Sequence, residues 1–205
     1  MRFLALSSLL LLCLGCGRAL YQDLTPTAAD ASALKRMKPS FSTTLYRTEI
    51  EVVGKHLSGL LFFKSLPDST FRVVFTNEMG LNLFDFQFAD RNFKVIHCID
   101  QLNKKPVINQ LRKDIGFLLM ADLDFAKGKE LRKGSSTYYR FAAGEEFTYY
   151  ITDSASYHIR RIENTTAKRR KVVVTLTNLS EGMPDSVFVD HKLFDFTISL
   201  KQIHR

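Results

Sequence analysis

Histidine and cysteine are the side chains of this sequence best suited to bind a metal or to act in catalysis. The five histidines stand at positions 56, 97, 158, 191 and 204, and they show no metal-ligand spacing. His97 and Cys98 are adjacent, but neighbours on a strand point to opposite faces, so they do not form a nucleophile–base pair. We therefore predict no catalytic residue, no metal site and no cofactor.

One serine stands at a spacing known from enzymes. Ser32 and Lys35 fit S-x-x-K, yet the S-D-N and K-T-G partners of that motif are missing, so we interpret the match as chance. No G-x-S-x-G, P-loop or dinucleotide fingerprint occurs either. A hydrolase with an unrecognised site remains an alternative, but no catalytic group has a partner at usable spacing. We expect the protein not to be an enzyme.

Cys16 has the clearest chemical role, as a site of lipid attachment. Arg2 precedes an apolar stretch over residues 3–14, which suits a signal peptide and is shorter than the roughly 20 residues that a bilayer requires. The stretch ends in Leu14-Gly15-Cys16, which resembles the lipobox of bacterial lipoproteins, although Cys13 stands where lipoboxes usually have leucine. An ordinary secretory signal is the alternative.

The lipobox resemblance implies a signal peptide over residues 1–15 and an acylated Cys16 that anchors the mature chain in a membrane. Gly17 follows where an aspartate would retain a lipoprotein in the inner membrane. The implied location is therefore the bacterial outer membrane, with the protein facing the periplasm. Cys98 would be the single other cysteine of the mature chain, so we expect no intramolecular disulfide.

Composition indicates a globular, basic protein. The 205 residues are 45% hydrophobic and carry 29 Lys and Arg against 21 Asp and Glu, a formal net charge of +8. Three cysteines exclude a disulfide scaffold and a four-cysteine zinc site.

A basic cluster at Lys168, Arg169, Arg170 and Lys171 suits a membrane surface or an acidic partner, or is simply a solvated loop. We do not expect nucleic acid as a partner, because the basic runs carry no aromatic RNA-binding signature.

The chain divides into a short leading part and one large domain. Residues 16–40 are expected to hold the lipidated N-terminus, a polar tether and a short helix capped by Asp30. From residue 41, β-branched and aromatic residues recur between turn signals. These patterns predict strands at 41–53, 57–65, 70–77, 81–89, 92–99, 136–142, 145–153, 156–163, 169–179, 185–190 and 193–203.

The hydrophobic period changes between residues 106 and 120. Val107, Leu111, Ile115 and Leu118 recur at helical spacing after Pro106, which suits a first turn. We predict an amphipathic helix here and a basic connection over residues 127–134. About eleven antiparallel strands are too many for a flat sheet. The predicted fold is mostly β (α+β), a single half-barrel domain over residues 41–205 whose curled sheet is covered by a helical lid.

Phenylalanines would line the inside of such a sheet. Rings that alternate along the predicted strands share one face, and our candidates for a cavity lining are Phe75, Phe84, Phe86, Phe88, Phe194 and Phe196. An acyl chain would suit that surface, since each buried CH₂ contributes about 0.8 kcal/mol. The alternative is that the same rings fill a dry core. Periodicity alone favours the core.

The predicted architecture on a lipid-anchored chain resembles the LolA/LolB group of lipoprotein carriers, with a local match to LolB. Residues 60–80 resemble that family's hairpin and the loop that follows it, and Met183-Pro184 with the strand at 193–203 resembles its closing hairpin. The resemblance implies an apolar cavity and an apolar residue protruding toward the membrane. Met79 stands at that position, although Glu78 replaces a usual proline.

The leading hypothesis is therefore a monomeric, lipid-anchored lipoprotein without catalytic activity. It would bind acyl chains or acylated lipoproteins, receive them from a periplasmic carrier protein and assist their delivery to the outer membrane. The alternative is a structural or assembly lipoprotein with a filled core, whose basic loops bind a protein partner.

Overall fold

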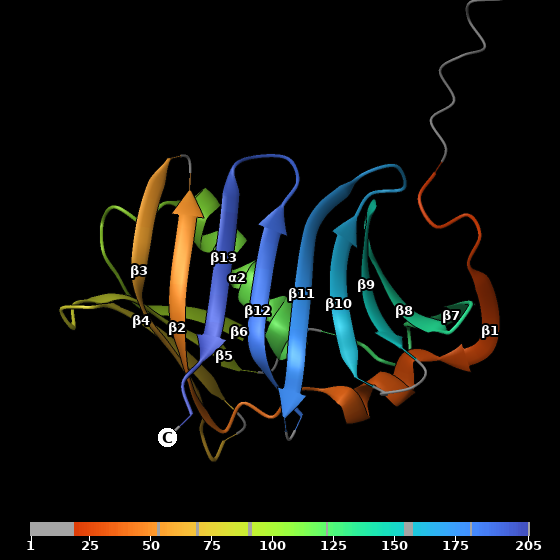
Figure 1. Cartoon of the computed structure of the whole chain (residues 1–205), viewed down its shortest axis with the longest axis horizontal. Helices are drawn as coiled ribbons and strands as arrows, with labels where there is room; N and C mark the ends of the chain where they lie inside the picture. The colour runs from red at the N-terminus through yellow and green to blue at the C-terminus, as the bar shows by residue number, and fades with distance from the viewer. Residues whose placement is uncertain are drawn as a thin grey trace, which may run out of the picture.

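The computed structural model describes residues 19–204 except 53, 69, 90, 91, 122, 154–157 and 181. The predicted signal peptide and Cys16 lie outside the described residues. Within them, thirteen strands form one antiparallel sheet in the order β1-β7-β8-β9-β10-β11-β12-β13-β2-β3-β4-β5-β6. The sheet curls around α2 (Lys105–Leu119), which lies against its inner face (Figure 1). The fold is therefore mostly β, as the sequence predicts.

Eleven of these strands correspond to the eleven predicted from the sequence. Their bounds are β2 Thr43–Val52, β3 Lys55–Ser65, β4 Phe71–Asn77, β5 Asn82–Ala89, β6 Asn92–Cys98, β8 Ser136–Ala143, β9 Glu146–Asp153, β10 Ile159–Thr165, β11 Arg170–Ser180, β12 Met183–His191 and β13 Phe196–Gln202. Each is hydrogen-bonded to its neighbours in the sheet. Strands β13 and β2 join the early and late strands inside the sheet, and their residues pair from Phe196↔Val52 to Gln202↔Tyr46. The sheet is open, with β1 and β6 at its two edges.

Two further strands were not expected. β1 (Thr25–Asp30) lies where we predicted a tether, and β7 (Lys129–Lys133) lies in the predicted basic connection. The two pair with each other at the edge of the sheet. Both are short and polar, and β1 forms the edge while β7 lies between β1 and β8. Neither shows the apolar alternation by which a strand is recognised in a sequence.

Helix α2 begins and ends close to its predicted bounds. A proline stands in its first turn, and Met120 ends it in the left-handed region with φ 49°, its N–H donating to the carbonyls of Gly116 and Phe117. Its apolar residues join one core with the inner face of the sheet. The short 3₁₀ helix η2 (Ala31–Met37) follows Asp30, whose side chain accepts a hydrogen bond from the Ser32 N–H. No helix in the described part of the chain is long and apolar enough to cross a bilayer.

The residues before β1 lie against the outer face of the sheet and form what we call the N-terminal strap, residues 19–24. Tyr21 packs between Tyr138 and Tyr149, with ring centroids 5.5 and 4.6 Å away. Its hydroxyl donates to Glu163, and the Leu20 N–H donates to the Ala167 carbonyl at 2.8 Å. The expected tether is thus replaced by docked chain from residue 20 onward, because aromatic contacts hold the strap in place.

Candidate functional site

An apolar hollow opens beside the first turns of α2. It has a volume of about 330 Å³, and β2, β3, β5, β13 and α2 all contribute to its wall. Its lining residues are Ile50, Val52, Leu57, Phe84, Leu102, Pro106, Val107, Gln110, Leu111, Phe194 and Phe196. The single polar side chain among them, Gln110, donates to Asp114 at 2.9 Å and is therefore satisfied without a ligand.

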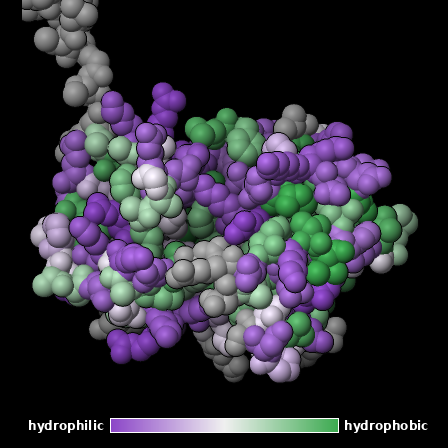
Figure 2. Space-filling view, turned by 180° about the vertical axis from the view of Figure 1, so that it is seen from behind, coloured by the Kyte–Doolittle hydropathy of each residue, from purple (hydrophilic) through white to green (hydrophobic). Residues whose placement is uncertain are grey.

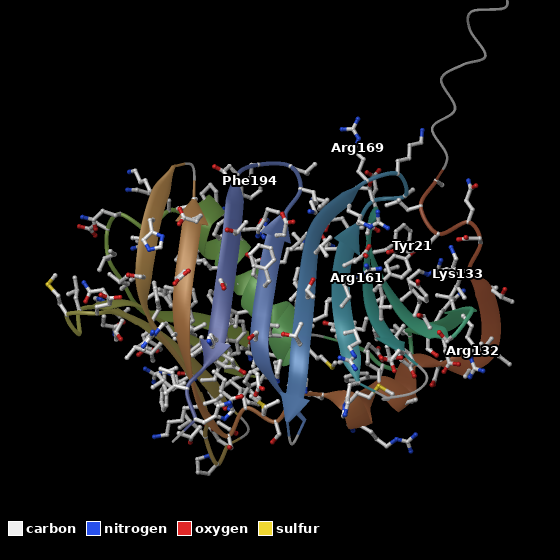
Figure 3. All side chains as sticks on the ribbon, in the orientation of Figure 1. Tyr21, Arg132, Lys133, Arg161, Arg169 and Phe194 are labelled. Atoms are coloured by element: carbon white, nitrogen blue, oxygen red, sulfur yellow. The ribbon has the colours of Figure 1, made fainter. Side chains whose placement is uncertain are left out.

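Three of the six predicted lining residues lie at this apolar hollow. Phe84 and Phe196 are buried in its wall, whereas Phe194 is 47% exposed. Phe194 belongs to the bend that precedes β13 and not to the strand itself, so the predicted strand at 193–203 begins later, at Phe196. Figure 3 shows Phe194 at this end of β13.

The other three candidates do not line the apolar hollow. Phe75 and Phe86 are fully buried in the core, and Phe86 stacks on Phe84 with centroids 4.4 Å apart. Phe88 lies beyond the opposite end of α2, where it lines two other hollows. The expected single cavity is therefore divided, because α2 fills the middle of the curled sheet and covers the rings between its two ends.

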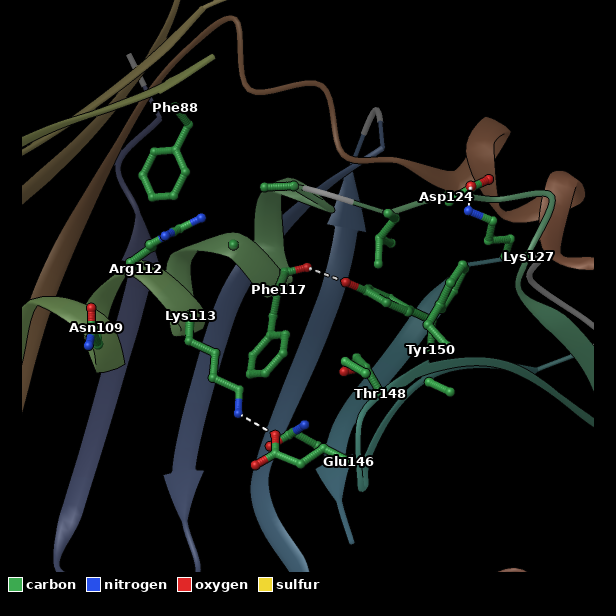
Figure 4. Close-up of a pocket in the computed structure, with 17 residues that line it drawn as sticks. Phe88, Asn109, Arg112, Lys113, Phe117, Asp124, Lys127, Glu146, Thr148 and Tyr150 are labelled. Atoms are coloured by element: carbon green, nitrogen blue, oxygen red, sulfur yellow. Dashed lines mark hydrogen bonds and ion pairs between the residues drawn. The ribbon is translucent and has the colours of Figure 1, made fainter. Parts of the chain in front are cut away.

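The first of these two hollows, which we call the charged hollow, lies between α2 and the strands β8 to β10 (Figure 4). It has a volume of about 690 Å³. Its apolar wall includes Phe117, Phe141 and Tyr150, and the Tyr150 hydroxyl donates to the Phe117 carbonyl at 3.1 Å. The second, the adjoining hollow, has a volume of about 780 Å³ and shares Phe88, Ala121 and Leu123 with the first.

A cluster of ionic groups stands in the wall of the charged hollow. Glu146 accepts from Lys113 at 2.6 Å and also from Lys171. Burial raises the pKa of Glu146, but hydrogen bonds from Lys113, Lys171 and Asn164 outweigh burial and lower it to about 2. Two ammonium groups thus share one carboxylate, so the cluster carries a net positive charge.

A buried hydrogen-bonded pair links α2 to the sheet. Nε2 of His191, the last residue of β12, lies 3.0 Å from Oδ2 of Asp114. Burial raises the pKa of Asp114 in spite of hydrogen bonds from His191 and Gln110. We did not predict this pair. The sequence did contain a signal for it. Asp114 stands three residues after Leu111 and four before Leu118, so it lies on the apolar face of the predicted helix, where a carboxylate needs a partner.

Met79 lies at the tip of the β4–β5 hairpin and is 90% exposed. The turn is held by Asn77, whose side-chain oxygen accepts from the N–H groups of Met79 and Leu81, and by Gly80 at φ 82°. Leu81 is exposed as well. Figure 2 shows hydrophobic side chains gathered on the half of the molecule that carries β4 to β6. The loop is therefore built to hold an apolar residue in solvent.

The basic cluster of residues 168–171 is divided among different surroundings. Lys168 and Arg169 are exposed in the turn between β10 and β11. Arg170 lies on the outer face, where it donates to Glu163 at 2.7 Å and stands over the Tyr21 ring. Lys171 reaches the charged hollow. Within the described residues, no group of three His, Cys, Asp or Glu side chains is arranged to hold a metal ion.

Comparison with known proteins gives a likeness of fold. No protein-family model and no curated protein sequence matches the chain. The crystal structure of a DUF1329 family protein from Desulfovibrio piger is similar over 88% of this chain and 92% of that chain, with a TM-score of 0.50 and 11% sequence identity. The crystal structure of a domain described as an outer membrane lipoprotein-sorting protein from Vibrio parahaemolyticus covers 83% of this chain and 87% of its own, with a TM-score of 0.47 and 6% identity. The first of these shows that the curled sheet around a helix is a fold found in solved proteins.

Proposed function

We propose that this protein is a lipid-anchored envelope lipoprotein that binds acyl chains and assists the delivery of lipoproteins or lipids to the outer membrane from the periplasmic side. The observation that carries the proposal is the apolar hollow. Its wall is made almost wholly of aliphatic and aromatic side chains, and Phe194 at its rim is half exposed. No catalytic step is assigned.

The wall of the apolar hollow suits a ligand without polar atoms. Each CH₂ group transferred from water to such a surface contributes about 0.8 kcal/mol, so a chain of several carbons gains affinity without any directed hydrogen bond. The amide of Gln110 is already engaged by Asp114, and no other polar side chain lines the hollow. An acyl chain therefore meets a wall in which Gln110 is the one polar side chain, and the nitrogen of that amide already has a partner.

The delivery step is assigned to the β4–β5 hairpin tip. Met79 and Leu81 are exposed apolar residues on a turn that is held by its own hydrogen bonds. A flexible thioether side chain adapts to an irregular apolar surface such as a bilayer. A periplasmic carrier protein is the proposed source of the cargo.

The alternative function, a structural or assembly lipoprotein, is favoured by different residues. Phe75 and Phe86 are fully buried core residues, and Lys168 and Arg169 are exposed at the β10–β11 turn, where an acidic partner could reach them. In that case the apolar hollow would stay empty.

Photochemical labelling tests the proposed function. The full chain is incubated with a fatty acid that carries a mid-chain diazirine, irradiated, and digested for mass mapping. We expect labels on the wall of the apolar hollow and at least a fivefold loss in Phe194→Glu. Phe188→Glu is the matched control, since Phe188 is 44% exposed and does not line that hollow. Equal labelling of both variants, or labels scattered over the surface, would contradict the proposal.

A further inference from the structure

The charged hollow differs in chemistry from the apolar one, and α2 separates the two. Its wall holds Arg112 and Lys113 of α2 and Glu146 of β9, and it lies against the apolar residues that it shares with the adjoining hollow. The ionic groups therefore stand beside an apolar wall that includes Phe88, Phe117 and Phe141. A ligand that matches both the ionic groups and the apolar wall must be an amphiphile.

The ionic end favours an anion. Lys113 and Lys171 both donate to Glu146, so one carboxylate neutralises at most one of the two ammonium groups. The two lysine side chains are 35% and 31% exposed, so an entering group can still reach them. An anionic oxygen placed here would compete with Glu146 for their N–H donors.

Asn164 adds a second, independent requirement. Its side chain lines the charged hollow, although the residue is only 2% exposed. Its amide hydrogen-bonds Glu146, which can only accept, so the nitrogen must face the carboxylate. The amide oxygen Oδ1 is then left buried without a partner. A buried acceptor of this kind is costly unless a donor reaches it, so the ligand should also carry an O–H or N–H group.

We propose that the charged hollow binds the phosphate head group of an amphiphile, with its alkyl chain along the apolar wall of the same hollow. A phosphate monoester supplies both features, since its second pKa near 6 leaves anionic oxygens together with a fraction of P–OH donors. The phosphate oxygens accept from Lys113 and Lys171, and the hydroxyl donates to Oδ1 of Asn164. The alkyl chain lies against Phe88 and Leu123. This site is separate from the acyl site of the proposed function.

The test uses the full chain and a photoreactive dodecyl phosphate, displaced by four unlabelled competitors. Dodecyl phosphate should compete at least tenfold better than dodecanol, which lacks the anion, and than inorganic phosphate, which lacks the chain. Dodecyl phosphate should also compete better than its O-methyl diester, which keeps one negative charge but lacks the P–OH group. Equal competition by dodecanol would overturn the proposal. If inorganic phosphate competed as well as dodecyl phosphate, the site would be one for free phosphate and the amphiphile would be excluded.

Variants of the cluster give effects of opposite sign. Lys113→Gln and Lys171→Gln should each weaken binding about tenfold, because each removes a donor to the phosphate. Glu146→Gln should strengthen binding, because it removes the competing carboxylate. Lys201→Gln, exposed on β13 and remote from the hollow, is the control and should change nothing. A loss of binding in Glu146→Gln would show that the ion pairs only hold the wall together, and would overturn the proposal.

One further variant separates this site from the acyl site. Phe194→Glu should leave the labelling by dodecyl phosphate unchanged while it reduces labelling by the fatty acid. If Phe194→Glu reduced both, the amphiphile would lie in the apolar hollow, and the second site would be refuted while the proposed function stood.

Discussion

Asp114 of α2 and His191 of β12 form a buried pair with 3.0 Å between Oδ2 and Nε2, and their side chains are only 2% and 1% exposed. The pair lies behind the rim of the apolar hollow, because the imidazole stacks on Phe196 with centroids 4.5 Å apart and packs at a tilt against Phe194 with centroids 4.9 Å apart. It therefore fixes the helix and the aromatic wall of the hollow relative to each other.

Breaking this pair should destabilise the fold. In Asp114→Leu the imidazole of His191 loses its partner inside the core, and removal of one member of a buried pair typically costs about 3–5 kcal/mol. We expect a free energy of unfolding lower by about 3 kcal/mol, measured by urea denaturation. The double variant Asp114→Leu, His191→Phe has no polar group left to satisfy and should recover most of the loss. A double variant no more stable than Asp114→Leu would refute this explanation.

Acid should weaken the contact between α2 and β9 through Glu146. The pKa of this carboxyl falls from 4.5 to about 2 on folding, so its stabilising contribution is complete above about pH 4.5 and is lost as the pH falls toward 2. The unfolding free energy of the native chain should therefore decrease over this interval more steeply than that of Glu146→Gln. Glu145→Gln, at the exposed neighbouring position, is the control and should follow the native profile.

Met79 should matter for membrane contact and not for folding. Because its side chain is exposed, Met79→Asp should change the unfolding free energy by no more than about 0.5 kcal/mol. Under the proposed function, loss of an apolar insertion worth about 1.5 kcal/mol or more should slow the transfer of a bound fluorescent fatty acid to vesicles about tenfold. Met79→Leu should transfer at the native rate. A native rate in Met79→Asp would exclude the hairpin tip from delivery.

Tyr21 should hold the N-terminal strap on the sheet mainly through its ring. Tyr21→Ala removes the packing against Tyr138 and Tyr149, so we expect fast hydrogen exchange at the Leu20 amide, which donates to Ala167. Tyr21→Phe keeps the ring, and Glu163 still accepts from Arg170 and still forms an ion pair with Arg161. Hydrogen exchange at the Leu20 amide of Tyr21→Phe should therefore stay close to the native rate. Fast exchange in both variants would show that the hydroxyl, not the ring, secures the strap.

The sequence predicted the elements well because apolar alternation marks them. The rings of Phe84, Phe86 and Phe88 share the inner face of β5 as predicted, and α2 lies within a residue of its predicted bounds. Alternation could not distinguish these rings from one another. Which of them lines a hollow depends on how far α2 covers the sheet, and that is a property of the packed structure.

Other features had little or no local signal. The pairing of β1 with β7 joins segments about 100 residues apart, and both lack the alternation of a half-buried strand. The cluster at the charged hollow comes from one helix and three strands, so no spacing in the sequence could indicate it. Its members are Lys113, Glu146, Lys171 and Asn164. Charged residues on the polar face of a predicted amphipathic helix, such as Lys113, are ordinarily solvated.

Because the N-terminal strap is docked on the sheet, only a short length of chain separates the predicted lipid from the folded domain. Ala19 is the first described residue, and a lipid attached at position 16 would be joined to it through only three residue steps of at most about 3.8 Å each. A lipid on Cys16 would then keep the turn that bears Lys168 and Arg169 near the membrane surface, because the Leu20 N–H donates to the Ala167 carbonyl beside that turn. The protein would meet the bilayer with one defined side and could not turn freely above it.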